Sequence, residues 1–425
     1  MTDETDSEEA TEDGLHGSDI HHDPWLVPAS EPLADIATSI FEQIEHNSPQ
    51  SSRRRTDARE RRRGIVDNLV ANLALLVLFH PTGSRLAISA KNTAATRYDR
   101  PAFSREVVMR MVSELASLGF VLRQRGVKGQ GRTTIEPTLL LRSAMVLDNE
   151  RSHLGRANGA ETIILKASSG RGRPKVLVNY EDTLETVSMR RDMEVINKIL
   201  SHADLRLGPS VVPPPFLTRR FQIEHKEAPQ AFDRHGRLYG GFWMSLPKDQ
   251  RHRLRIGGEE VVDLDFASMF YQLARLEAGL ALPDRDPYED IEGLPRSAAK
   301  LALSALLCRA GPMMRLPAEL RQLLTRDWSA ERLAQALSER HSGIAHLFGT
   351  GIGLRLMFTE SRILVAALLR LANDDIPALP MHDGMMVAAS KEGAARMAMA
   401  AASNEIVGIG LPVRRKEILK PAFFQ

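Results

Sequence analysis

The sequence predicts an α+β protein of more than one domain. Apolar residues recur at spacings of three and four over 65–79 and 104–118, which is typical of amphipathic helices. Over 260–266 apolar and polar residues alternate instead, as they do in a strand with one buried face. With 425 residues, 43% of them hydrophobic, the chain is long enough for two or three domains with their own cores.

Cysteine content and hydropathy exclude several classes of protein. The single cysteine, Cys308, rules out an intramolecular disulfide framework and a Cys-rich zinc site. No apolar run approaches the roughly 18 residues that a membrane span needs, and the N-terminus is acidic where a signal peptide would be basic. We therefore expect a cytoplasmic protein with no membrane partner.

Charge is distributed unevenly along the chain. Residues 1–50 contain 13 Asp and Glu and no Lys or Arg, so the remainder has 56 basic against 41 acidic residues, a formal charge of +15. A basic body suits a polyanionic partner, but an arginine-rich sequence also arises from a GC-rich genome. Because residues 1–52 contain few large apolar side chains, we predict a mostly disordered tail, with one short helix around Ile40, Phe41 and Ile44.

Residues 53–145 are predicted to form helices followed by a hairpin. An arginine run over 53–63 suits either contact with phosphates or a solvated helix start. The first helix ends at His80-Pro81, and the second begins after Ser104, a suitable N-cap. Two strands then follow, joined by the basic, glycine-rich turn over 126–131.

Helices followed by a basic hairpin resemble a winged helix-turn-helix. In that family the second helix enters a major groove and the hairpin contacts phosphate. The resemblance implies DNA contacts by basic residues of this helix and hairpin. These residues are Arg105, Arg110, Arg123, Arg125 and Lys128. A structural or protein-interaction module is the alternative.

Residues 146–232 are predicted to be a connector with a thumb-like region. Strands are expected over 162–167 and 175–179, and a long helix over 181–202. The Pro213-Pro214-Pro215 segment marks a boundary or a stiff connector. No Gly-Lys-Ser/Thr sequence occurs, so a phosphate-binding loop of the Walker type is excluded.

Residues 233–425 contain the candidate chemistry. Asp265 ends a predicted strand just before a helix, a position suited to holding a divalent cation but also common for helix caps. The His382-Asp383-Gly384 sequence lies between two apolar arms, and Asp-Gly is by itself the ordinary signal of a hairpin turn. Arg296 and Lys300 share one face of a predicted helix, where they would bind a triphosphate or simply be solvated.

The order of these motifs resembles the palm and fingers of family A DNA polymerases and of the related phage-type single-subunit RNA polymerases. The matching elements cover a little under half of the chain. In order they are Gly236-Arg237-Leu238, Asp265-Phe266-Ala267 (motif A), Asp286 to Ile291, Arg296 with Lys300 (motif B) and His382-Asp383 (motif C). The resemblance implies a reduced right-hand polymerase fold, with an antiparallel palm sheet, helical fingers and the helix over 182–202 as a thumb-like element. The winged-helix-like domain would precede it.

The resemblance also implies roles for the acidic and basic residues. Asp265 and Asp383 would be ligands of two Mg²⁺ ions, or of Mn²⁺ in their place. Arg296 and Lys300 would neutralise phosphate charge, and Lys300 would be the general acid toward pyrophosphate. Asp263 shares a strand face with Asp265 but does not precede the aromatic residue of the motif, so it is the weaker candidate ligand.

Three further residues would contact nucleic acid according to the same resemblance. His382 would contact the primer terminus, and Arg237 would contact the minor-groove edge of the nascent base pair. Arg355 lies on the helix before motif C, where it would face template or primer, or pair with the Glu360 side of that helix. The implied partners are therefore a DNA primer-template or single-stranded DNA, and nucleoside triphosphates.

The sequence also departs from the family pattern near the nucleotide site. Phe270 stands where family A DNA polymerases have a Glu of the ribose filter, so the choice of sugar stays open. Ser304 and Cys308 replace the two aromatic residues of the fingers helix, and Gly384 replaces the Glu of motif C. Phe270 and Ser304 remain the candidate nucleotide-binding residues at these positions.

Three functions remain open from the sequence. The preferred one is a primer-extending DNA polymerase of family A type. The second is a primer-independent RNA polymerase or a primase-like enzyme, which Phe270 and Ser304 permit. The third is a non-catalytic DNA-binding initiator or regulator with a relic palm, which the missing aromatic residues of the fingers helix would suit.

Overall fold

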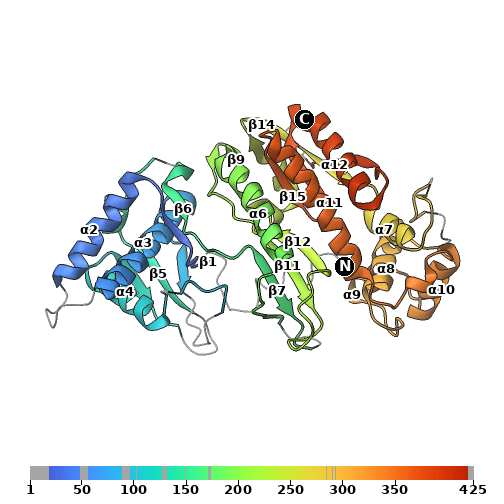
Figure 1. The fold of residues 1–425 in the computed structure, drawn as a ribbon, viewed down its shortest axis with the longest axis horizontal. Helices are drawn as coiled ribbons and strands as arrows, with labels where there is room; N and C mark the ends of the chain where they lie inside the picture. The colour runs from blue at the N-terminus through green and yellow to red at the C-terminus, as the bar shows by residue number, and fades with distance from the viewer. Residues whose placement is uncertain are drawn as a thin grey trace. The chain divides into compact units, whose positions relative to one another are not determined.

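The chain forms two compact units with mixed helices and strands (Figure 1). The computed structural model describes residues 19–47, 56–88, 96–101, 103–126, 132–148, 150–170, 174–283, 285–289, 291 and 293–419. The N-terminal unit extends to Glu161 and includes Leu205–Pro214, whereas the C-terminal unit comprises Thr162–Asp204 and the chain from Pro215 onward. The α+β class is confirmed. The main boundary follows residue 161, not residue 145 or 232, because the strand that follows it pairs within the C-terminal unit.

The N-terminal unit packs helices on a four-stranded sheet of order β1-β3-β5-β4. Its elements are β1 (Asp19–His21), β2 (Leu26–Pro28), α2 (Glu31–Asn47), α3 (Thr56–Phe79), β3 (Arg85–Ile88), α4 (Arg105–Ser117), β4 (Val121–Gln124), β5 (Thr133–Pro137), α5 (Leu139–Ala144), η1 (Arg151–His153), β6 (Leu154–Arg156), and the hairpin of β9 (Leu205–Leu207) and β10 (Ser210–Val211). The predicted hairpin exists as β4 and β5, and β3 also pairs with β5. That this unit is a winged helix remains a prediction.

Residues 19–47 are an integral part of this unit, so the predicted disordered tail is wrong for them. One face of α2 is buried in the same core as α3, with Phe41 2% exposed and Ile44 fully buried. The short helix expected around Ile40, Phe41 and Ile44 is present as part of α2. The tail prediction failed because polar residues dominate the composition of the segment, which conceals the apolar face of this helix. Residues 1–18 and 48–55, which include the first three arginines of the basic run, lie outside the described residues.

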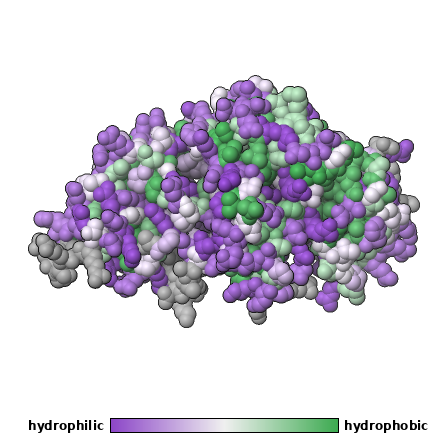
Figure 2. All heavy atoms as spheres, viewed as in Figure 1, coloured by the Kyte–Doolittle hydropathy of each residue, from purple (hydrophilic) through white to green (hydrophobic). Residues whose placement is uncertain are grey.

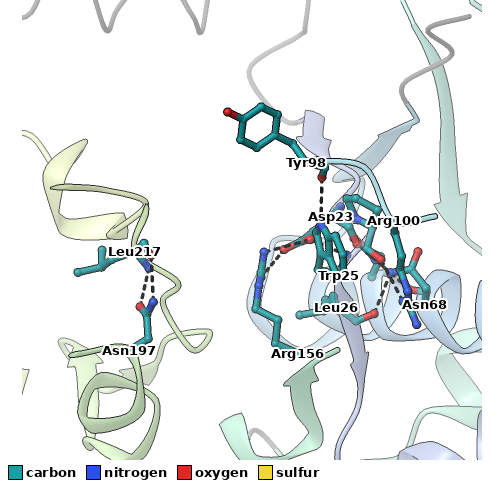
Figure 3. A network of polar contacts seen from close by, with 11 residues as sticks. Asp23, Trp25, Leu26, Asn68, Tyr98, Arg100, Arg156, Asn197 and Leu217 are labelled. Carbon is teal, nitrogen blue, oxygen red and sulfur yellow. Dashed lines mark hydrogen bonds and ion pairs between the residues drawn. The ribbon is translucent and has the colours of Figure 1, made fainter. Parts of the chain in front are cut away.

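Buried polar contacts attach the segment before α2 to α3 (Figure 3). Asn68 is fully buried, and its side-chain nitrogen Nδ2 donates to the backbone carbonyl oxygens of Asp23 and Leu26, at 2.8 Å in both cases. Arg156 pairs with the Asp23 carboxylate at 2.7 Å, and the Trp25 indole donates to the Tyr98 carbonyl at 3.3 Å. The Asn68 contacts satisfy polar groups in the core, and together with the Arg156 and Trp25 contacts they specify where the segment lies.

The C-terminal unit contains two sheets and seven α-helices in its described residues. Its elements are β7 (Ile163–Ala167), β8 (Val176–Leu177), α6 (Leu184–His202), β11 (Thr218–Ile223), β12 (His235–Tyr239), η2 (Phe242–Met244), η3 (Lys248–Arg253), β13 (Leu254–Ile256), β14 (Glu259–Phe266), α7 (Met269–Glu277), α8 (Arg296–Cys308), α9 (Ala318–Leu323), α10 (Ala330–Arg340), η4 (Ala345–Leu347), α11 (Gly353–Asn373), β15 (Ala378–Met381), β16 (Gly384–Ala388), η5 (Ala389–Lys391), α12 (Glu392–Val407) and β17 (Val413–Lys416). One sheet has the order β12-β11-β7-β8.

The other sheet, here called the central sheet, is antiparallel in this unit. In this unit, strand β14 pairs with β16 of the β15–β16 hairpin on one side and with β13 and then β17 on the other side. Helices α11 and α12 run side by side and both contact this sheet (Figure 1). The last residues of β14 are therefore flanked by a strand on each side.

Helix α6, the expected thumb-like element, packs against α11 and β7. Its Asn197 side chain binds the backbone of Leu217 through both of its polar groups, at 2.7 and 2.9 Å (Figure 3). These contacts fix the helix to the C-terminal unit at Asn197, and its thumb-like role remains a prediction. On the face that Figure 2 shows, hydrophilic residues predominate and the hydrophobic ones gather mainly over the C-terminal unit. None of the described helices combines the length and hydropathy needed to cross a membrane.

Candidate active site

The two predicted carboxylates meet at the end of the central sheet. Asp265 is the penultimate residue of β14 and pairs in register with Gly384 at the start of β16. Asp383 immediately precedes Gly384 in the turn between β15 and β16, and its carboxyl group is hydrogen-bonded to that of Asp265. Antiparallel pairing thus brings together two acids that are 118 residues apart in the sequence.

Basic residues of β17 also contact Asp265. The Asp265 side chain is only 2% exposed, and its Oδ2 forms an ion pair with the Lys416 ammonium group at 2.8 Å. The guanidinium of Arg414 lies 3.5 Å from the same oxygen. Oδ1 is buried and has no hydrogen-bond partner among the described residues. One oxygen of Asp265 is thus neutralised, and the other is left without a donor.

The surroundings shift the pKa values of the two acids in opposite directions. Burial raises the pKa of Asp265 to about 7, and the negative charge of Asp383 adds to this effect, while Lys416 opposes it. Burial alone would also raise the pKa of Asp383. The positive charges of Lys416 and Arg237, together with the hydrogen bond to Asp265, outweigh burial, so the pKa of Asp383 is lowered. Two neighbouring acids that share one proton show this behaviour.

Gly384 is required by the close approach of β16 to β14. A Cβ atom at this position would lie 2.3 Å from the carbonyl oxygen of Leu264 and 3.2 Å from the Cα atom of Asp265. The sequence suggested that Gly384 merely removes a carboxylate relative to the family pattern. In the structure, the absence of a side chain allows Asp383 to reach Asp265.

Gly384→Ala is expected to separate the two strands at the site. The added methyl group meets backbone atoms that cannot rotate away, so the free energy of unfolding should fall by about 1–3 kcal/mol. Urea denaturation measures this loss. Gly393→Ala is a suitable control, because nothing lies within 4 Å of a Cβ atom there. Equal stability of the two variants would contradict this account of Gly384.

A buried ion pair lies next to the carboxylates. The Arg237 side chain extends from β12, and its Nε donates to Glu360 Oε1 on α11 at 2.8 Å. Only 2% of the Glu360 side chain is exposed. Burial raises the pKa of Glu360, and the nearby Asp383 adds to that rise, although Arg237 opposes it. The positive charge of Arg237 is thus shared between Glu360 and the carboxylate pair.

Asp286 and Tyr288, in the segment before α8, contact Arg296 and link it to the start of α7 near the carboxylates. Both Nε and Nη2 of Arg296 bind Asp286 Oδ2, at 2.9 and 2.5 Å, and the guanidinium lies over the Tyr288 ring at 5.4 Å from its centroid. The Tyr288 hydroxyl is hydrogen-bonded to Ser268, the residue before α7. Burial raises the pKa of Tyr288 to about 12, with contributions from the charges of Asp286 and Asp383.

The other predicted residues of the nucleotide site have fewer contacts. Lys300 is exposed on α8 and, in the described part of the chain, forms no ion pair with Asp265 or Asp383. The Ser304 hydroxyl donates to the Lys300 carbonyl oxygen at 3.0 Å. Phe270 is half-buried in the first turn of α7. The structure therefore groups Arg296 with the site and leaves Lys300 extended into solvent.

The predicted nucleic-acid contacts of this unit lie on different elements. His382 is half-buried in the turn of the β15–β16 hairpin, with a left-handed φ of 53°. Arg355 pairs with Glu277 of α7 at 3.0 Å, whereas the expected alternative partner, Glu360, pairs with Arg237.

Of the residues predicted to bind DNA in the N-terminal unit, Arg105 and Arg110 lie on α4, Arg123 lies on β4 and Arg125 follows β4. Arg105 and Arg125 are exposed, Arg110 pairs with Glu106 at 2.8 Å, and Arg123 donates to the Ser113 hydroxyl at 2.7 Å. Lys128 lies outside the described residues. These positions leave DNA binding by this unit a prediction.

The carboxylate pair suits the ligand preference of Mg²⁺. Protein sites for this ion commonly use one or two carboxylates and complete the coordination with water and substrate phosphates. The unpartnered, buried Oδ1 of Asp265 is an oxygen ligand of the required kind. Asp263, 7% exposed on the same strand face, is a further carboxylate nearby. In the described residues, no group of three or more His, Cys, Asp or Glu is arranged to hold a metal, so phosphate oxygens would have to complete such a site.

Several residues of the site were missed from the sequence. Lys416, Arg414 and Glu360 contact the predicted residues directly, and Tyr288 lies between Arg296 and Ser268. In an extended strand Arg414 and Lys416 share one face, but three consecutive basic residues contain no alternating pattern that would have indicated the strand. Nothing local to Glu360 could have identified Arg237, 123 residues away, as its partner.

Comparisons with known proteins give little further information. Neither the protein-family models nor the curated proteins contain a match to this chain. Among solved structures, the chain is similar to the POL domain of Pol1 from M. smegmatis, in complex with DNA primer-template and dNTP, at a TM-score of 0.33 and 10% sequence identity. The similarity covers 92% of this chain and 66% of that one, so the chain spans just under two thirds of that domain. The similarity is distant, and no residue assignment rests on it.

Proposed function

We propose that the C-terminal unit is a template-directed nucleotidyltransferase that extends the 3′ end of a DNA primer, of the family A polymerase type. The observation that carries this proposal is the convergence of Asp265 and Asp383 at the end of an antiparallel sheet, where one buried carboxylate oxygen of Asp265 has no partner among the described residues. Strand pairing supports this juxtaposition, which the sequence motifs require.

Each residue of the site has a role in this proposal. Asp265 and Asp383 would hold divalent ions, which when bound activate a hydroxyl nucleophile and stabilise the charge of a leaving pyrophosphate. Arg296, stacked on Tyr288, would exchange its ion pair with Asp286 for the triphosphate. Lys300, one helical turn further on, would donate a proton to the pyrophosphate. Arg237 would orient the primer-template from beside the carboxylates.

The test is nucleotide incorporation by the full-length chain with Mg²⁺. Four reactions, combining primed or unprimed DNA template with deoxyribo- or ribonucleotides, separate the candidate functions. We expect extension of the primed template, measured as added nucleotides on a denaturing gel. Products on unprimed DNA would favour the primase-like alternative. Absence of incorporation in all four reactions, together with DNA binding, would favour the non-catalytic alternative.

A further inference from the structure

The basic residues of β17 divide between the two faces of the central sheet. Asp265 pairs in register with Arg414, and Asp263 pairs with Lys416. Arg414 and Lys416 both contact the Asp265 carboxylate. Arg415 lies between them in sequence, and its side chain binds Glu392 at 3.2 Å. Alternation along the strand thus directs two of three consecutive cations to the carboxylate pair.

The two cations on this face offset the charge that would attract a metal ion. Lys416 and Arg414 share Oδ2 of Asp265, which leaves Oδ1 as its one oxygen without a partner among the described residues. Asp263 on the same strand face adds a third carboxylate beside the pair, and Lys416 and Arg414 offset part of the negative charge of this group. A divalent ion that approaches Asp265 therefore meets a buried carboxylate that is already bound to an ammonium group, although the Lys416 side chain itself is 41% exposed.

We propose that Lys416 is an intramolecular competitor of the divalent cation at Asp265. Its ammonium group holds Oδ2 in the resting protein, and a divalent ion gains full access to the carboxylate only when Lys416 leaves. This inference rests on the proposed function in taking the carboxylate pair as the metal site. It adds that the chain itself limits the affinity of this site for metal, because two cations compete for one carboxylate.

The test measures binding of Mn²⁺ alone to the full-length protein, without nucleotide or DNA. Free Mn²⁺ is quantified by electron paramagnetic resonance during titration of wild type and of Lys416→Met. We expect Lys416→Met to bind Mn²⁺ at least about tenfold more tightly than wild type, because the competing charge is gone. Arg415→Met is the matched control, since it removes a cation of the same strand that does not contact Asp265, and its affinity should equal that of wild type. Adding Asp265→Asn to Lys416→Met should abolish the gain.

Equal or weaker Mn²⁺ binding by Lys416→Met would overturn the proposal. A second measurement on wild type applies even if the variant does not fold. Lysine side chains are labelled with an amine-reactive reagent, with and without Mn²⁺, and the modification of Lys416 is quantified by peptide mass spectrometry. Release from Asp265 should increase the labelling of Lys416 several-fold in the presence of Mn²⁺. Unchanged labelling would contradict the displacement.

The outcome is distinguishable from failure of the proposed function. If no nucleotide is incorporated but Lys416→Met binds Mn²⁺ more tightly, the competition stands and the polymerase assignment falls. If incorporation depends on Asp265 but Lys416→Met leaves Mn²⁺ affinity unchanged, the polymerase assignment stands and the competition falls.

Discussion

Asp265→Asn and Asp383→Asn are each expected to abolish primer extension. Each substitution replaces a carboxylate oxygen by an amide nitrogen, which does not bind a divalent cation, at a point where the two acids are hydrogen-bonded to each other. The rate of extension should fall at least about 100-fold, equivalent to about 2.7 kcal/mol in the activation barrier. Single-nucleotide incorporation on a primed template measures this loss.

Two controls separate a loss of chemistry from a loss of structure or of DNA binding. Glu259→Gln removes a carboxylate from the same strand that binds Ser390 instead of the site, and it should extend primers at the wild-type rate. DNA affinity should be nearly unchanged in both Asp variants, because basic groups provide most of the attraction to phosphate. Extension by either Asp variant at close to the wild-type rate would refute the assignment of the carboxylate pair as catalytic.

Arg237→Met is expected to be the most destabilising substitution of a charged residue near the site. It leaves the Glu360 carboxylate, 2% exposed, without its cation and beside the negative charge of Asp383. Breaking a buried ion pair on one side costs about 3–5 kcal/mol, because the remaining charge has neither water nor a partner. The free energy of unfolding from urea denaturation should fall by this amount.

Removing Glu360 as well as Arg237 shows whether the loss of stability comes from the unpaired Glu360 charge. In Arg237→Met/Glu360→Leu both charges are absent, so most of the stability should return. Arg355→Met is the matched control, because the Arg355–Glu277 pair is exposed on both sides and should contribute about 0–1 kcal/mol. A double variant as unstable as the single one would show that Arg237 stabilises the fold through other contacts. Weakened primer-template binding by a stable double variant would support the additional nucleic-acid role of Arg237.

Local sequence patterns predicted the elements around the site better than the contacts within it. The alternation over 260–266 and the helix after it correspond to β14 and α7, and the two apolar arms around His382-Asp383-Gly384 correspond to β15 and β16. These predictions succeeded because hydrophobic periodicity reflects burial within one element. The tail predicted over residues 1–52 failed for 19–47, because average composition conceals a single apolar helix face.

Residues from distant elements complete the candidate site, and local patterns do not identify them. Lys416 reaches Asp265 because β17 pairs with β14, and Glu360 reaches Arg237 because α11 packs beside β12. For Lys300 the local prediction was correct, but no tertiary prediction was possible. The four-residue spacing correctly predicted that Lys300 shares a helix face with Arg296, whereas the exposure of the Lys300 side chain depends on how α8 packs.

Local sequence patterns are sufficient to predict the α+β class, the strand that carries Asp265 near its end, the turn that carries Asp383 and the order of the acidic and basic motifs. Each of these depends on residues close together in the chain, whose spacing sets periodicity and turn formation. Tertiary structure alone decided that the two acids share a hydrogen bond, that Gly384 permits their approach, and that Lys416 and Arg414 neutralise one oxygen of Asp265. Those features depend on strand register and burial between segments more than a hundred residues apart, and no local pattern specifies them.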